Sequence, residues 1–181
     1  MEDAELLKLF RESDNPRKAF DAIIHAYGER LYWHIRKMVV SHDDANDVLQ
    51  NCMLKAWKGL PAFREESKLY TWLYRIATNE VITFLKKHRT HRFQSLSEVS
   101  RQLTETLHAD PFFNGDNVQL TLQKAIHALP KKQRLVFTMR YFDELKYEDI
   151  SEIVGTSVGA LKASYHHAVL KIEEYMKQHL S

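Results

Sequence analysis

The segment from Leu129 to Ile172 contains two helical patterns joined by a glycine, and this pairing restricts most strongly how the chain can fold. In YEDISEIV the apolar residues recur at the spacing of one helical face. Gly155 follows directly, with the backbone freedom to end a helix in a left-handed conformation. Thr156 and Ser157 then offer N-caps to a second helix. The segment therefore predicts a helix-turn-helix.

The second helix of this segment has an apolar face and a cationic face. The apolar residues follow one another at steps of three and four: Val158, Leu161, Tyr165, Ala168 and Ile172. The opposite face carries small, cationic or hydrogen-bonding groups: Lys162, Ala163, His166 and His167. No Asp or Glu occurs between Gly155 and Ile172. Such a face suits a groove lined by phosphates and base edges, so duplex DNA is the first partner to consider; an ordinary solvated helix of a bundle is the alternative.

Composition narrows the class of protein. The chain has 181 residues, 44% of them hydrophobic, with only 5 Gly and 4 Pro, which favours helices in one domain or two small ones. Its 26 Lys and Arg against 24 Asp and Glu give a net charge of only +2, so positive charge is local. Cys52 is the single cysteine and lies at a core position of a helical pattern. We see no signal peptide and no apolar run near the roughly 20 residues that span a bilayer, and expect a cytoplasmic protein without direct membrane insertion.

Two long helices are predicted in the N-terminal part. Asn15 and Pro16 begin a helix that runs to about Val40, with one buried face: Ala19, Phe20, Ile23, Ile24, Tyr27, Leu31 and Ile35. Ser41 and Asp44 resemble a capping box and begin a helix to Leu60. Its core stripe is Ala45, Val48, Leu49, Cys52, Met53, Ala56, Trp57 and Leu60. The remaining face carries Asp47, Gln50, Asn51, Leu54, Lys55 and Lys58. A leucine among polar groups is typical of a docking surface and equally ordinary on a soluble protein, so spacing leaves both interpretations open.

The sequence from Arg64 to Arg92 combines aromatic residues with positive charge. A helix here is expected to bury Leu69, Trp72, Leu73, Ile76, Ala77 and Phe84. Its other faces would carry Tyr70, Tyr74, Arg75, Asn79, Lys86 and Lys87. Aromatic rings beside cations hold single-stranded nucleic acid, but the same pattern also describes a filled core with solvated cations. His88 and His91 have a spacing that would allow a shared metal, yet no further ligands converge, so we expect neither a metal nor a cofactor.

The character of the chain changes between Phe93 and Asn117. One Arg stands there against the acidic residues Glu98, Glu105, Asp110 and Asp116. Leu96, Val99, Leu103 and Leu107 are spaced for a short amphipathic helix within this stretch. The helical period resumes from Val118. We therefore predict an all-α protein of two small helical domains, residues 1–92 and 118–181, joined by a flexible acidic linker, residues 93–117.

Three motifs, in this order, resemble the extracytoplasmic function (ECF) group of bacterial RNA polymerase sigma factors, members of the sigma-70 family built of regions two and four only. DDANDVLQNCMLKAW resembles the helix that docks on the polymerase clamp, and FREESKLYTWLYRIATN the segment for the promoter minus-ten element. LPKKQRLVF through GTSVGALKASYHHA resembles the minus-thirty-five reader. The resemblance implies a transcription initiation factor that binds core RNA polymerase, recognises and melts promoters, and is held inactive by an anti-sigma factor, often membrane-bound.

The resemblance also assigns three sets of residues. Contact with the clamp helices of the largest polymerase subunit falls to Asp47, Gln50, Asn51, Leu54 and Lys55. The minus-ten element, including a base flipped from the non-template single strand, falls to Phe63, Arg64, Ser67, Tyr70, Arg75, Asn79, Lys86 and Lys87. The minus-thirty-five duplex falls to Thr156, Ser157, Gly159, Lys162, Ala163, Ser164, His166, His167 and Lys171. Two departures stand out: Glu65 replaces a usual glycine, and Ser164 and His167 stand where arginines are common.

Other functions fit the sequence less well. A stand-alone helix-turn-helix regulator would need paired half-sites and a dimer seam, and none is evident. A nuclease or other enzyme would need a carboxylate cluster, a nucleophile elbow or a phosphate-cradling glycine loop, and the chain has none of these. A pure adaptor would leave the C-terminal helix-turn-helix unexplained. We expect a monomeric, non-enzymatic DNA-binding protein.

Overall fold

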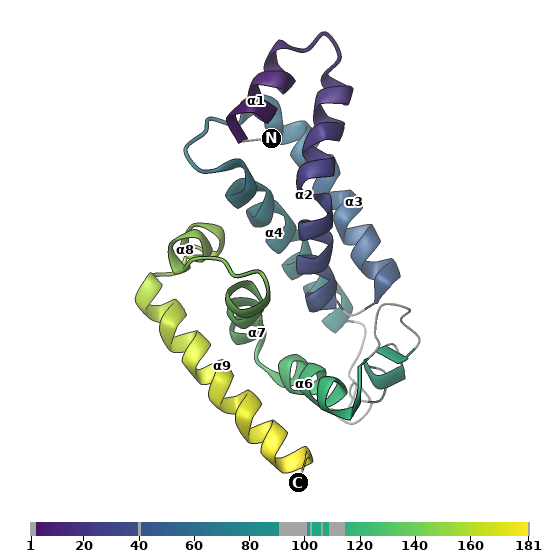
Figure 1. Ribbon diagram of the computed structural model, residues 1–181, viewed down its shortest axis with the longest axis vertical. Coiled ribbons are helices and arrows are strands. Elements are labelled where there is room, and N and C mark those ends of the chain that lie inside the picture. The colour runs from purple at the N-terminus through teal and green to yellow at the C-terminus, as the bar shows by residue number, and fades with distance from the viewer. Residues whose placement is uncertain are drawn as a thin grey trace.

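The computed structural model describes residues 3–39, 41–90, 101, 103–105, 107, 108 and 115–180, and all regular structure within these ranges is helical (Figure 1). The N-terminal lobe contains α1 (Asp3–Glu12), α2 (Pro16–Val39), α3 (His42–Gly59), the short 3-10 helix η1 (Leu60–Ala62) and α4 (Leu69–Thr90). The C-terminal lobe contains α6 (Asn117–Ala128), α7 (Lys131–Phe137), the π-helix η2 (Thr138–Phe142), α8 (Tyr147–Val154) and α9 (Val158–His179). The expected all-α class is confirmed.

Most of the predicted helix starts are set by a side-chain cap. The Asp44 amide donates to Ser41 Oγ (3.4 Å) at the start of α3, and the Ala160 amide donates to Ser157 Oγ (3.3 Å) at the start of α9. Gly155 has φ +68°, the left-handed position that ends α8. Thr156 is not the cap residue of α9. The helix-turn-helix thus has the local geometry that its sequence predicts.

The acidic stretch 93–117 lies largely outside the described residues, among them Leu96, Val99, Glu98 and Asp110. Leu103 and Leu107 are described, helical and buried, as the amphipathic pattern predicted. Asp116 has a structural role, since its carboxylate accepts the Gln119 amide (3.0 Å) and caps α6.

The N-terminal core follows the predicted stripes with one correction. Cys52 is fully buried between α3 and its neighbours, and burial raises the pKa of its thiol to about 12, so it packs as a small apolar residue. Ile24, expected in the core, is 36% exposed, and that expectation was wrong. The adjacent Ile23 is buried as expected, and toward the C-terminal end of α2 the buried face also includes His34, Met38 and Val39.

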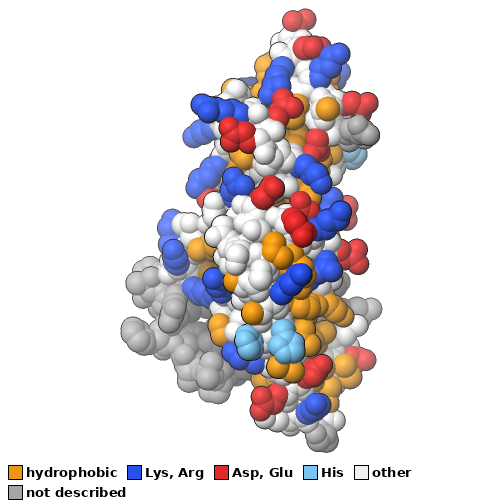
Figure 2. All heavy atoms as spheres, turned by 90° about the vertical axis from the view of Figure 1, so that its left-hand side faces the viewer, with side chains coloured by type: hydrophobic (Ala, Val, Ile, Leu, Met, Phe, Trp, Pro, Cys, Tyr) orange, Lys and Arg blue, Asp and Glu red, His pale blue; other side chains and the backbone are white. Residues whose placement is uncertain are grey.

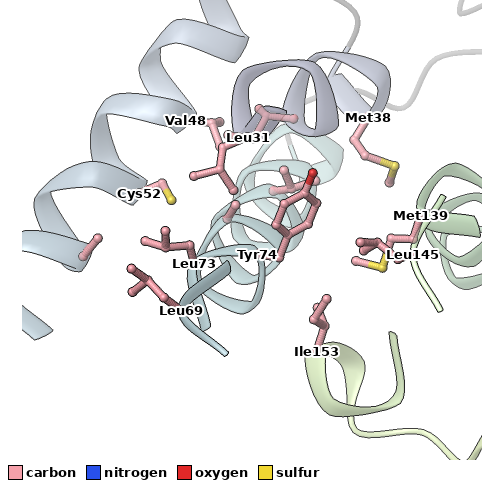
Figure 3. Packing of buried hydrophobic residues seen from close by; sticks show 14 of the residues in the cluster. Leu31, Met38, Val48, Cys52, Leu69, Leu73, Tyr74, Met139, Leu145 and Ile153 are labelled. Carbon is pink, nitrogen blue, oxygen red and sulfur yellow. The ribbon is translucent and has the colours of Figure 1, made fainter. Parts of the chain in front are cut away.

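The two lobes pack against each other along a seam that α2 and α4 form with η2 and α8 (Figure 1). Tyr74 lies at its centre and is 1% exposed, so the expectation that it occupies an open face of α4 was wrong. Figure 3 shows the reason: Leu73 and Tyr74 leave α4 on opposite sides, and the Tyr74 ring lies on the side that faces Met139 and Leu145 of the C-terminal lobe. A contact between lobes has no local sequence pattern.

A buried carboxylate joins the lobes at this seam. Asp143, whose side chain is 3% exposed, accepts from His34 Nδ1 (2.7 Å) and from Lys37 Nζ (2.8 Å), both on α2. His34 is fully buried, and its Nε2 lies 3.1 Å from Thr78 Oγ1 on α4. Burial alone raises the pKa of Asp143, but the hydrogen bond and charge of His34 and then those of Lys37 outweigh burial and hold the pKa below its usual value.

We expect Asp143→Asn to lower the free energy of unfolding by about 2 kcal/mol at pH 7, since a hydrogen bond to a charged group is worth roughly that much. Because the pKa of Asp143 is depressed in the folded state, its contribution is present above the unfolded pKa of about 4 and is lost as pH falls through the folded value. The difference between wild type and variant should therefore shrink below pH 4 in urea titrations. Glu144→Gln, the same chemical change at the exposed neighbour, is the control. Equal effects of both substitutions would contradict a specific role for Asp143.

Candidate nucleic-acid interface

The docking face consists of Asp47, Gln50, Asn51 and Leu54 on α3. All four are exposed, and Leu54, at 54%, is the most exposed leucine among the described residues. Because α3 packs through its other side on α2 and α4, the docking face stays uncovered when the lobes are packed together. Lys55 borders it and forms an ion pair with Glu80 of α4, so its ammonium group is partly committed within the lobe.

The minus-ten face consists of the loop from Phe63 to Lys68 and the residues of α4 that follow it. Arg64, Asn79, Lys86 and Lys87 are exposed, whereas Ser67 is half-buried. Phe63 differs from the others because it is 8% exposed, with its ring 5.0 Å from that of Trp72. Phe63 therefore anchors the loop to the core in this conformation and presents no free ring to a base.

The C-terminal lobe covers part of the minus-ten face. Arg75 Nε donates to the carbonyl oxygen of Glu152 (3.1 Å) at the end of α8. Burial, and then the hydrogen bond to Asp149 of α8, raises the pKa of Tyr70 to about 12. Tyr70 and Arg75 lie more than one turn of α4 apart, and both contact α8. In this arrangement α8 therefore occupies polar groups of both side chains.

The minus-thirty-five face lies on α9 and is open. Gly159, Lys162, Ala163, His166, His167 and Lys171 are exposed, and Ser164 is half-buried. Their predicted orientation away from the core is thus confirmed, with Leu161 and Ala168 fully buried on the other side. Lys162 Nζ lies 5.8 Å from the ring centre of Tyr147, a cation–π contact between α9 and α8 within the helix-turn-helix. Figure 2, which views the side carrying α8 and α9, shows histidines beside basic side chains on this surface.

The start of α9 adds backbone donors to this face. Ser157 caps the helix and is exposed, and Gly159 has open space around its Cα. Amide groups at a helix N-terminus attract phosphate through their partial positive charge. Thr156 is half-buried and lines a cavity of about 300 Å³ between the lobes, with Leu85 and Val136 among its neighbours. Of Ser157 and Thr156, both predicted to contact DNA, Ser157 is therefore the more exposed.

Sequence reasoning missed the residues that hold the lobes and the loop in place. Asp143 stands in an ordinary polar stretch. His34 directly follows two aromatic residues, Tyr32 and Trp33, with no sign of a partner 109 positions away. Asp3 and Arg11 of α1 contact the minus-ten loop across more than 50 positions of sequence. No local sequence pattern indicated these partners.

The described residues contain no group of three or more His, Cys, Asp or Glu placed to hold a metal ion. His88 stacks on Phe84, with ring centres 3.9 Å apart, and His91 lies outside the described residues. None of the described helices combines the length and apolar character that a membrane-spanning helix requires.

Each lobe matches a known protein-family model. Residues 23–91 match the family model for sigma-70 region 2, and residues 119–172 match that for sigma-70 region 4. The chain is 30% identical to the ECF RNA polymerase sigma-E factor of Haemophilus influenzae, over 94% of this chain and 93% of that protein. It is 28% identical to the RNA polymerase sigma-H factor of Pseudomonas aeruginosa, over 97% and 94% of the two chains.

Two solved structures share the fold. The sigma factor RpoE in complex with the anti-sigma factor NepR from Bartonella quintana superposes with a TM-score of 0.68 at 23% identity, covering 88% of this chain and 98% of that one. CnrH in complex with the cytosolic domain of CnrY superposes with a TM-score of 0.70 at 19% identity, covering 97% of each chain.

We expect Ser157→Ala to lower the free energy of unfolding by about 1 kcal/mol, because the Ala160 amide loses its acceptor at the start of α9. Ser157→Asp should leave stability close to that of the wild type, since Asp caps equally well and its charge suits the helix N-terminus. Chemical denaturation followed by circular dichroism measures both. If alanine and aspartate prove equivalent, Ser157 does not act as the cap in solution.

Proposed function

The chain belongs to the extracytoplasmic function group of sigma-70 factors, and from this premise we propose that its three exposed faces carry out successive steps of transcription initiation. The chain is a sigma factor, which binds core RNA polymerase and directs it to promoters. In this proposal residues 1–92 form the region 2 domain, residues 118–181 form the region 4 domain, and residues 93–117 link them. The protein contributes no catalytic step of its own and acts in the cytoplasm with the polymerase.

We assign polymerase binding to the docking face of α3. The observation that carries the assignment is the exposure of Leu54 among Asp47, Gln50 and Asn51, since a leucine in that setting gains most from burial against a partner. The docking face is also available while the lobes are packed together. Polymerase can therefore engage the protein before the lobes separate.

We assign the minus-thirty-five element to the open face of α9 and the minus-ten element to α4 and its loop. The helix N-terminus and Lys162 would contact phosphates, while Ala163, Ser164, His166 and His167 would lie along the base edges. At the minus-ten element a flipped base would meet the loop and Asn79. Because α8 holds Tyr70 and Arg75, full contact with this element requires the seam to open.

We further propose that an anti-sigma factor holds this protein inactive. One of the two similar structures is a complex with the anti-sigma factor NepR, and the other is a complex with the cytosolic domain of CnrY. The inter-lobe cavity near Leu85 and Val136 is apolar, with Lys131 and Lys132 at its edge, and offers a place where a partner can bridge both lobes. A partner that binds only the packed form would keep the minus-ten face covered, because it stabilises that form by its own binding free energy.

Run-off transcription with core polymerase on a fragmented genomic library tests the central function. New start sites should appear with the wild type and should fall about tenfold or more with Leu54→Asp, because a buried charge at the docking face costs at least 1.4 kcal/mol of binding. Leu180→Asp introduces the same charge at another exposed leucine and should leave transcription intact. If no start sites appear while the protein alone binds duplex DNA tightly, a stand-alone helix-turn-helix regulator is the better conclusion.

Lys162→Ala should weaken binding of the minus-thirty-five duplex by the full chain and lower the magnitude of its salt slope by about 1, as expected for the loss of one phosphate contact. Fluorescence anisotropy across a series of salt concentrations measures the slope. Lys18→Ala removes an exposed lysine from the other lobe and serves as the control. An unchanged slope for Lys162→Ala would remove this lysine from the DNA contact.

A further inference from the structure

The minus-ten loop is held at both ends by the N-terminal helix α1. At one end, Arg11 Nη2 donates to the carbonyl oxygen of Phe63 (3.1 Å). At the other end, the amide of Leu69, the first residue of α4, donates to Asp3 Oδ2 (2.9 Å). Residues 3 and 11 lie at opposite ends of α1, so one short helix spans the whole loop.

The middle of the loop has an unusual backbone conformation. Glu65 has φ +59°, in the left-handed region that residues other than glycine seldom occupy. Its carboxylate forms an ion pair with Arg11, the same side chain that binds Phe63. Arg11 thus contacts the strained residue and the loop entrance at once, and a planar guanidinium with several donors is well suited to that double contact.

The anchor at the exit of the loop is itself held. The Tyr27 hydroxyl of α2 donates to Asp3, and this bond orients the carboxylate that caps α4. Asp3 and Leu7 of α1 line a cavity of about 460 Å³ together with the loop residues Ser67 and Lys68. The first helix therefore both fixes the loop and forms one wall of the space beside it.

We propose that α1 is the positioning element of the minus-ten loop, with Arg11 holding the left-handed Glu65 and Asp3 capping α4, so that the loop is shaped before it receives a base from the non-template strand. The proposal rests on the proposed sigma function. It extends the site beyond the region 2 match, which begins at residue 23. Arg11 and Asp3 are positioning residues, because they act on DNA through the loop.

A preformed loop lowers the ordering cost of capturing a flipped base, so its loss should weaken single-strand binding and leave the other faces unchanged. The holoenzyme made with Arg11→Ala should bind a fluorescent single-stranded non-template oligonucleotide that carries the minus-ten element about tenfold more weakly than the wild type. Its affinity for the minus-thirty-five duplex should stay the same. Lys8→Ala, which removes an exposed cation one turn away on α1, controls for general electrostatics.

Glu65→Gly provides the decisive comparison. Glycine adopts the left-handed conformation without help, so Arg11→Ala with Glu65→Gly should regain most of the single-strand affinity. A merely structural role for Arg11 would not predict this rescue. For the second anchor, Asp3→Ala should weaken single-strand binding. Asp3→Asn should preserve it, since the Asn oxygen can accept the Leu69 amide while its NH2 group donates to the Tyr27 hydroxyl oxygen. Thermal unfolding of each variant verifies that the lobe remains folded.

The possible results separate the two proposals. Single-strand affinity that is unchanged in Arg11→Ala, or a loss that Glu65→Gly does not restore, would overturn the role of α1 while wild-type start sites leave the sigma function standing. A loss of equal size with Lys8→Ala would show general electrostatics instead. If the wild type itself directs no start sites, the sigma function fails first and the role of α1 fails with it.

Discussion

The packed arrangement of the two lobes depends on one buried carboxylate. Asp143 accepts from His34 and Lys37, two basic side chains of α2, so both contacts cross the seam between the lobes. Removing a charge from water is costly, and the interaction offsets that cost only when both donors are in place. The apolar contacts around Tyr74 stabilise the seam but have no preferred direction. The hydrogen bonds at Asp143 are directional, so they restrict how α2 can lie relative to the residues that follow η2.

Because of this seam, the docking, minus-ten and minus-thirty-five faces differ in how exposed they are. The docking face on α3 and the minus-thirty-five face on α9 are exposed, while α8 contacts Tyr70 and Arg75 on α4. A ligand shifts an equilibrium only by its differential affinity for the two states, so polymerase contact with an equally open α3 does not by itself separate the lobes. Separation has to come from contacts that exist only in the open form, such as those of DNA with the surface beneath α8. Promoter binding and separation of the two lobes are therefore linked equilibria.

The sequence was sufficient for the features whose causes are local. Caps at Ser41 and Ser157, the left-handed Gly155 and the apolar stripes of α3 and α9 all follow from neighbouring residues, and all were predicted. The division into two lobes was predicted from the change in composition and charge between Phe93 and Asn117. The seam could not be predicted from the sequence, because a buried tyrosine and an exposed tyrosine on α4 have the same local pattern. Which of them is buried depends on contacts with the opposite lobe. The Glu65 substitution was visible as a departure, but its left-handed backbone and its arginine partner required the structure.

The chemistry of α9 places more of the promoter discrimination on the minus-ten loop. In the proposed complex, lysine and amide groups at the helix start would contact phosphates, and phosphate contacts set position but carry no base information. Guanidinium forks, worth about 1–3 kcal/mol of discrimination each, are missing from the exposed face, where Ser164 and His167 stand instead. Flipping a base costs a few kcal/mol, and only a loop that fits the correct base regains that free energy. A chain with a weak duplex reader thus gains most from a rigid loop, and the two anchors supplied by α1 provide that rigidity.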